Sequence, residues 1–154
     1  MALTIETPAF APNAPIPDQY ARRGANVSPR VEWHGAPLDT RSFALIVEDP
    51  DAPKGTFRHW AAYDIPGDAV LLDEGAGSDQ QGAALKMARN DFGDVRYDGP
   101  QPPPGHGVHH YHFRLFALDT AELDLPADAS AQQVLAAAEA HALAQAETVG
   151  TFER

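Results

Sequence analysis

The stretch SFALIVEDPDAP, residues 42–53, joins an apolar run to a turn rich in acids and prolines. Residues 43–47 are apolar at every position, which predicts a β-strand buried on both faces. The strand then carries Glu48, Asp49 and Asp51 to its end, where carboxylates are costly to remove from water. Taken by themselves, these acids either mark a turn into solvent or form the wall of a site.

The length and charge of the chain limit its class. Its 154 residues predict one domain, residues 1–154. The net charge of −11 opposes binding to nucleic acid and to an anionic membrane. No apolar run approaches the ~18 residues of a membrane-spanning helix. The N-terminal MALTIETPAF lacks the basic start and apolar run of a signal peptide, so we expect a cytoplasmic protein.

The sequence contains no cysteine, which excludes a disulfide framework, a thiolate nucleophile and a cysteine-based zinc site. The histidine-rich run HGVHHYH, residues 106–112, does not predict a metal centre, because strand alternation turns His109 away from His110 and His112. Neither a phosphate-binding glycine loop nor a GxSxG motif is present. We therefore expect no metal and no cofactor.

Fourteen prolines and 12 glycines separate short strand-like runs, a pattern that predicts a β-dominated sandwich. One helix is expected at residues 130–144, with Ser130 or Asp128 as its N-cap. Two segments are expected to lack regular structure for most of their length, residues 11–33 and the long loop 66–107. Strands are expected at residues 3–10, 41–49, 57–65, 107–119 and 147–152.

Strand alternation places polar groups near the ends of otherwise apolar faces. These groups are Asp49, His59 and the pair His109 and Tyr111. If the strand of residues 57–65 is regular, His59 shares its face with Ala61 and not with the adjacent tryptophan. The four polar groups could converge in one site, or Asp49 could be a turn residue and His59 a hydrogen-bonded core histidine.

Five segments in this order resemble the phosphatidylethanolamine-binding protein family, most closely its bacterial Raf-kinase-inhibitor-like (YbhB/YbcL-type) branch. They are GANVSPRVEW (24–33), DPDAP (49–53), HW (59–60), the stretch from NDFGD to FALD (90–119) and AHALAQAETVGTFER (140–154). The resemblance implies a mostly β fold, in which a large central antiparallel sheet packs on a smaller sheet with few short helices.

The resemblance also implies a pocket that takes phosphate-like or carboxylate-like groups. Its lining residues would be Asp49, Asp51, Pro53, His59, His109 and Tyr111. We expect Asp49 to orient and charge a neighbouring imidazole, so that a protonated histidine and the tyrosine hydroxyl donate to the anion. The family usually has arginine at the position of His110, which alternation turns away from the pocket.

The function implied by this resemblance is non-enzymatic binding of a small anionic or phosphorylated ligand, with modulation of a partner kinase or protease. The alternative is a hydrolase or another acid/base enzyme that uses Asp49, His59, His109 and Tyr111. Ser28, Ser42, Ser78 and Ser130 lie outside the expected pocket segments, so no nucleophile accompanies these groups. We expect a monomer or a homodimer.

Overall fold

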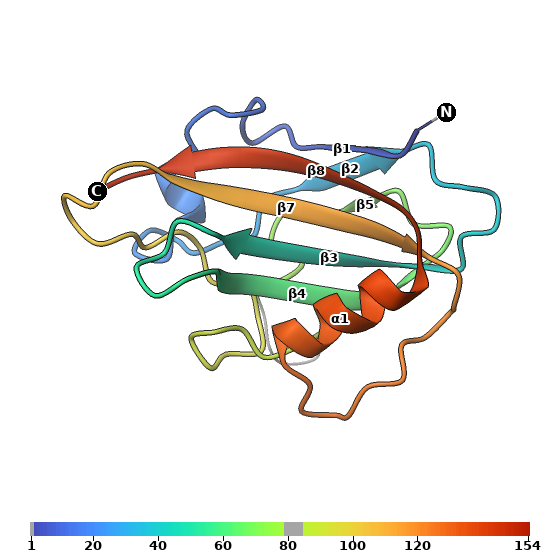
Figure 1. Cartoon of the computed structure of the whole chain (residues 1–154). Coiled ribbons are helices and arrows are strands. Elements are labelled where there is room, and N and C mark those ends of the chain that lie inside the picture. Colours follow the sequence, from blue (N-terminus) through green and yellow to red (C-terminus); the bar gives the residue numbers. More distant parts are fainter. Residues whose placement is uncertain (1, 79–84) are drawn as a thin grey trace.

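The computed structural model describes residues 2–78 and 85–154, whose strands form two antiparallel sheets (Figure 1). The larger sheet contains, in spatial order, β6 (Lys86–Met87), β4 (Phe57–Pro66), β3 (Ser42–Asp49), β7 (His109–Leu118) and β8 (Ala142–Phe152). The smaller contains β1 (Thr4–Glu6), β2 (Val31–His34) and β5 (Leu71–Leu72). The helices are the 3-10 turn η1 (Asp18–Tyr20) and α1 (Ala131–His141). The predicted mostly β fold with two sheets is confirmed.

The large sheet lies between the small sheet and α1, and its central strand β3 is buried on both faces (Figure 1). Trp33 of β2 packs with Phe43 and Leu45 of β3 in the core between the sheets. On the opposite face of β3, Ile46 packs in a second core with Val134 of α1. Each such fully buried side chain contributes about 1.5–3 kcal/mol. The uninterrupted apolar run of β3 therefore reflects its central place in the sheet.

Helix α1 begins at a capping box and ends earlier than the sequence predicts. The Ser130 hydroxyl accepts a hydrogen bond from the Gln133 backbone N–H at 3.2 Å, and the Gln133 side chain accepts one from the Ser130 N–H at 2.9 Å. The expected helix through Ala144 is wrong, because residues 142–144 already belong to β8, in which Ala142 and Ala144 pair with β7. Cross-strand pairing overrides the helix propensity of alanine here.

The other differences between the expected and the observed elements concern strands that the local sequence does not predict. Strand β8 has 11 residues, far more than the expected 147–152, because it pairs with β7 along its whole length. Strand β2 lies partly within the segment expected to be irregular, and the Trp33 indole N–H donates to the Ala69 carbonyl at 2.9 Å. The long loop contains the short strands β5 and β6. Residues 79–84 of that loop lie outside the described residues.

A β-bulge in β4 turns His59 toward the small-sheet side of the large sheet. Val47 pairs with Trp60 but the next residue, Glu48, pairs with Arg58, so His59 is an extra residue in β4. Trp60 therefore packs in the core between the sheets, whereas Ala61 packs against α1. The prediction that His59 shares a face with Ala61 is wrong, because the bulge breaks the alternation between them.

Candidate functional site

A cavity of about 170 Å³ lies where the C-terminal end of β3 meets the N-terminal ends of β4 and β7. It contains five of the six residues expected to line a pocket, namely Asp49, Pro53, His59, His109 and Tyr111. The sixth, Asp51, is not among the lining residues. The remaining lining residues are Ala52, Phe57, Phe92, Gln101, Pro102 and Pro103.

Asp49 and His109 form a buried pair at the base of the cavity. His109 Nδ1 lies 2.6 Å from Asp49 Oδ2, and the two side chains are only 2% and 4% exposed. The other carboxylate oxygen of Asp49 accepts the backbone N–H of Asp51 at 2.8 Å. Because a carboxylate accepts, His109 carries its proton on Nδ1 and its ring orientation is set by Asp49.

His59 is held by the backbone instead of by a carboxylate. Its Nδ1 donates to the Asp98 carbonyl at 2.8 Å. Burial lowers the pKa of His59 below its ordinary value, and the Asp98 carbonyl and the charge of Asp49 oppose this effect only in part. The histidine that Asp49 pairs with is therefore His109, while His59 is a neutral imidazole in the cavity wall.

Tyr111 brings a buried hydroxyl to the cavity. The residue is 1% exposed, and its hydroxyl makes no hydrogen bond within the described part of the chain. Burial raises the pKa of Tyr111, the charge and acceptor oxygens of the nearby Asp49 carboxylate raise it further, and the Gln101 backbone opposes them only in part, so the hydroxyl keeps its proton. Leaving a buried polar atom unpaired costs about 1–3 kcal/mol, which is unusual without a functional reason.

Aromatic rings form much of the cavity wall. Phe57, His59 and Phe92 contact one another edge to face, with ring centroids 4.7–5.4 Å apart. Phe92 lies on the loop that follows β6, and the Arg22 guanidinium lies 4.1 Å from the centroid of its ring. The sequence reasoning missed Phe57 and Phe92 as wall residues, although Phe92 lies in the NDFGD part of the family resemblance.

A buried carboxylate anchors the segment that holds His59. The Asp98 side chain is fully buried and accepts hydrogen bonds from the Asn26 and Asn90 amides, each at 2.9 Å, and from Arg96 at 3.2 Å. Burial alone raises the pKa of Asp98, but the hydrogen bonds outweigh burial and the net pKa is lowered. The charged Asp98 therefore fixes its own backbone carbonyl against His59.

His106 extends the Asp49–His109 pair toward solvent. Its Nδ1 lies 2.6 Å from His109 Nε2, and the His106 residue itself is exposed. Gly105 and Gly107 flank it with φ angles of 74° and 90°, a left-handed conformation that glycine adopts without strain. The only sequence sign of this contact was the histidine-rich run 106–112.

Asp51 forms a different pair outside the cavity. Its carboxylate accepts from both the backbone N–H and the Nδ1 of His110 at 2.8 Å, and both side chains are about half exposed. His110 is exposed, whereas His109 and Tyr111 on either side of it are buried, so the predicted alternation along β7 is confirmed. Asp51 thus contacts the residue at the family's arginine position.

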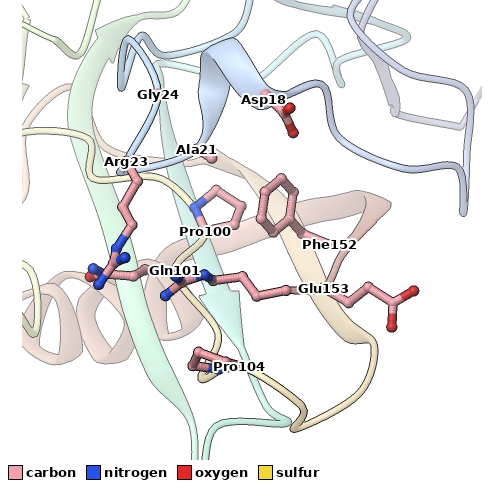
Figure 2. Close-up of a pocket in the computed structure, with 10 residues that line it drawn as sticks. Asp18, Ala21, Arg23, Gly24, Pro100, Gln101, Pro104, Phe152 and Glu153 are labelled. Carbon is pink, nitrogen blue, oxygen red and sulfur yellow. The ribbon is translucent and has the colours of Figure 1, made fainter.

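A second hollow of about 470 Å³ adjoins the cavity and shares Gln101 with it. Figure 2 shows Asp18 and Ala21 at one end of this hollow and Pro104 at the other, with Pro100 and Phe152 between them. Its volume is larger than that of the cavity, and none of the described residues that line it is a buried polar residue.

Two kinds of feature are absent from residues 2–78 and 85–154. In this part of the chain, no three His, Asp or Glu side chains are grouped so that they could hold a metal ion. Among the same residues, no helix has the length and apolar character needed to cross a membrane.

The chain matches known proteins along nearly its whole length. Residues 6–153 match the family model described as phosphatidylethanolamine-binding protein. A UPF0098 protein of Methanothermobacter thermautotrophicus is 42% identical over 155 residues, covering 99% of each chain. A protein of Mycobacterium tuberculosis named putative lipoprotein LppC is 42% identical over 152 residues, covering 98% of this chain and 72% of that protein.

A solved structure agrees with the fold. The crystal structure of E. coli YbcL, described as a new member of the mammalian PEBP family, superposes with a TM-score of 0.95 at 29% identity. The match covers 100% of this chain and 99% of YbcL. Sequence and fold lead to the same conclusion: this chain belongs to the phosphatidylethanolamine-binding protein family.

Proposed function

We propose that the cavity binds the phosphate-like or carboxylate-like head group of a small ligand without chemical turnover. The observation that carries this proposal is the Tyr111 hydroxyl, which is buried in the cavity wall and unpaired within the described residues. A ligand oxygen that accepts from this hydroxyl removes the cost of the unpaired group. The family description, phosphatidylethanolamine-binding protein, supports a phosphorylated head group.

The neighbouring residues suit such a ligand. His109 is oriented by Asp49, and its Nε2 faces Nδ1 of His106 at 2.6 Å, so an anion that bonds to His109 replaces that contact. The prolines Pro53, Pro102 and Pro103 stiffen the wall, so little conformational entropy is lost on binding. The cavity volume of about 170 Å³ limits the buried part of the ligand to a small group.

The enzymatic alternative rests on the hydrogen-bonded chain from Asp49 through His109 to His106, an arrangement that can move a proton. Covalent catalysis by a serine, threonine or cysteine nucleophile is not favoured, because none of these residues occurs among the described residues that line the cavity. Turnover of generic phosphoesters or esters that disappears in His109→Ala would support the enzyme and refute non-enzymatic binding.

Titration calorimetry with inorganic phosphate and with acetate tests binding directly. We expect the wild type to bind at least one of the two anions and Tyr111→Phe to bind it about tenfold to a hundredfold more weakly, as expected for the loss of one hydrogen bond to a charged group. Tyr63→Phe is the matched control, since Tyr63 is equally buried but packs on the α1 side of the sheet. Wild-type protein that binds neither anion would refute the proposal.

Three broader proposals rest on the sequence alone. They are modulation of a partner kinase or protease, assembly as a monomer or homodimer, and a cytoplasmic location. Sedimentation that shows a stable tetramer would refute the second, and recovery of the native protein from the membrane or the medium would refute the third.

A further inference from the structure

We infer that a second copy of this chain binds at the open edge of the larger sheet, where β8 of each copy pairs antiparallel with β8 of the other. The two larger sheets then form one continuous sheet across the dimer. The described residues that line the cavity include none of residues 142–148, which form this edge. The inference therefore goes beyond the proposed function and does not depend on it.

Strand β8 is the outermost strand of the larger sheet, and only part of its outer edge is covered (Figure 1). Residues 13–16 cover the edge near the C-terminal end of the strand. The Val149 carbonyl accepts from the Asn13 N–H at 2.7 Å, and the Thr151 carbonyl accepts from the Ile16 N–H at 2.7 Å. The backbone groups of Val149 and Thr151 therefore point away from β7.

The same geometry leaves Gln145 and Glu147 with free backbone groups. In an antiparallel pair, residues two apart direct their N–H and C=O groups to the same side. The register between β7 and β8 is unbroken from Ala144 onward, so Gln145 and Glu147 point outward like Val149. In the part of the chain that the structure describes, no backbone-to-backbone hydrogen bond beyond the ladder with β7 involves either residue. Such an edge is a template for another strand.

The open edge carries little that would keep another strand away. Its sequence, ALAQAET, contains one charged residue and neither of the residues, lysine and proline, that commonly protect sheet edges. Leu143 is 42% exposed although its side chain is large and apolar. A hollow of about 590 Å³ borders the edge and is lined in part by Gln145, Glu147 and, on β7, Arg114. An added strand therefore has room for its side chains.

The limits of the opening favour a second copy of β8 as the occupant. The opening begins where α1 ends, and it stops where residues 13–16 bond to Val149. When two copies pair antiparallel about a two-fold axis at Gln145, Ala142 of one copy lies opposite Thr148 of the other. Each copy then turns out of the sheet into α1 just where residues 13–16 of the other copy occupy the edge.

The side chains at this axis complement one another. Gln145 lies opposite Gln145 of the second copy, and a carboxamide both donates and accepts, so the two side chains can bond to each other. Glu147 lies opposite Leu143 of the second copy, so no like charges meet directly. A two-fold interface requires this kind of self-complementarity.

Hydrogen exchange resolved to single amides tests the pairing without any variant. In a single copy the amides of Gln145 and Glu147 have no acceptor, whereas those of Ala144 and Ala146 point to β7 and are protected. We expect protection of the first two amides to follow the dimer fraction that sedimentation measures at increasing concentration. Rapid exchange of both in dimeric protein would overturn the inference, as would a protein that stays monomeric up to about 1 mM.

A charge at the axis provides a matched pair of variants. Gln145→Lys places two lysines opposite each other, so we expect the dissociation constant of the dimer to rise at least about tenfold. Gln132→Lys is the control, because Gln132 is exposed near the start of α1 and the same charge there should leave dimerisation unchanged. Dimerisation of Gln145→Lys with the affinity of the wild type would overturn the inference.

Discussion

Nδ1 of His109 lies 2.6 Å from Oδ2 of Asp49, a carboxylate 60 residues earlier in the chain. Both side chains are buried, so each group depends on the other for the hydrogen bond that it would otherwise make with water. The pair joins the ends of the two neighbouring strands β3 and β7 and orients the imidazole at the base of the cavity.

Replacing Asp49 with asparagine tests this pair. The amide preserves the shape but loses the charge that favours the bond from His109, so we expect a loss of about 1–3 kcal/mol in the free energy of unfolding and weaker phosphate binding. Urea denaturation and calorimetry measure the two effects. Asp51→Asn is the control, since the exposed pair of Asp51 with His110 should contribute less than about 1 kcal/mol.

A second prediction concerns the pH dependence of stability through His59. Burial lowers the pKa of His59 below its ordinary 6.5. Between that ordinary value and the lower folded-state pKa, the unfolded chain binds a proton that the folded protein does not. The contribution of His59 to the free energy of unfolding is therefore complete above pH 6.5, and it declines as the pH falls below that value.

Unfolding of the wild type and of His59→Gln at several pH values measures this contribution. Taking the difference between the two proteins cancels the titration of the other histidines. We expect the advantage of the wild type to shrink between about pH 7.5 and about pH 5.5. An advantage that grows on acidification would show that His59 gains a proton on folding.

His106 and the ligand are expected to compete for one nitrogen. Nε2 of His109 has a single in-plane hydrogen-bonding position, which His106 occupies at 2.6 Å. If the ligand bonds to His109, then His106→Ala should increase phosphate affinity by about fivefold, the net value of one hydrogen bond. His110→Ala serves as the exposed neighbouring control, and weaker binding in His106→Ala would show that His106 assists the ligand instead.

Two buried tyrosines provide a contrasting pair. The Tyr97 hydroxyl donates to the Tyr20 carbonyl at 2.7 Å, whereas the Tyr111 hydroxyl is unpaired within the described residues. Tyr97→Phe should therefore lower the free energy of unfolding by about 1–2 kcal/mol, and Tyr111→Phe should leave it unchanged or raise it. Thermal and urea unfolding measure both. A large loss in Tyr111→Phe would mean that its hydroxyl has a structural partner.

Part of the site was predictable from residues that are close in sequence. Five of the six predicted pocket residues line the cavity, and strand alternation correctly separated His109 and Tyr111 from His110. Asp51 does not line the cavity, because its carboxylate accepts from His110 outside it. Whether these residues bind a ligand stays a prediction that the variants above test.

Sequence by itself determined the central strand β3, because an uninterrupted apolar run can only be buried on both faces. It also determined the β-rich class and limited the N-cap of α1 to Ser130 or Asp128, because both signals depend on neighbours a few residues apart; the structure shows that Ser130 is the cap. Only the tertiary structure decided that Asp49 pairs with His109 while His59 pairs with a backbone carbonyl. Both hydrogen-bond partners depend on the register between strands that are far apart in sequence. The bulge that turns His59 into the cavity forms only when β4 pairs with β3, so the sequence around His59 does not reveal it.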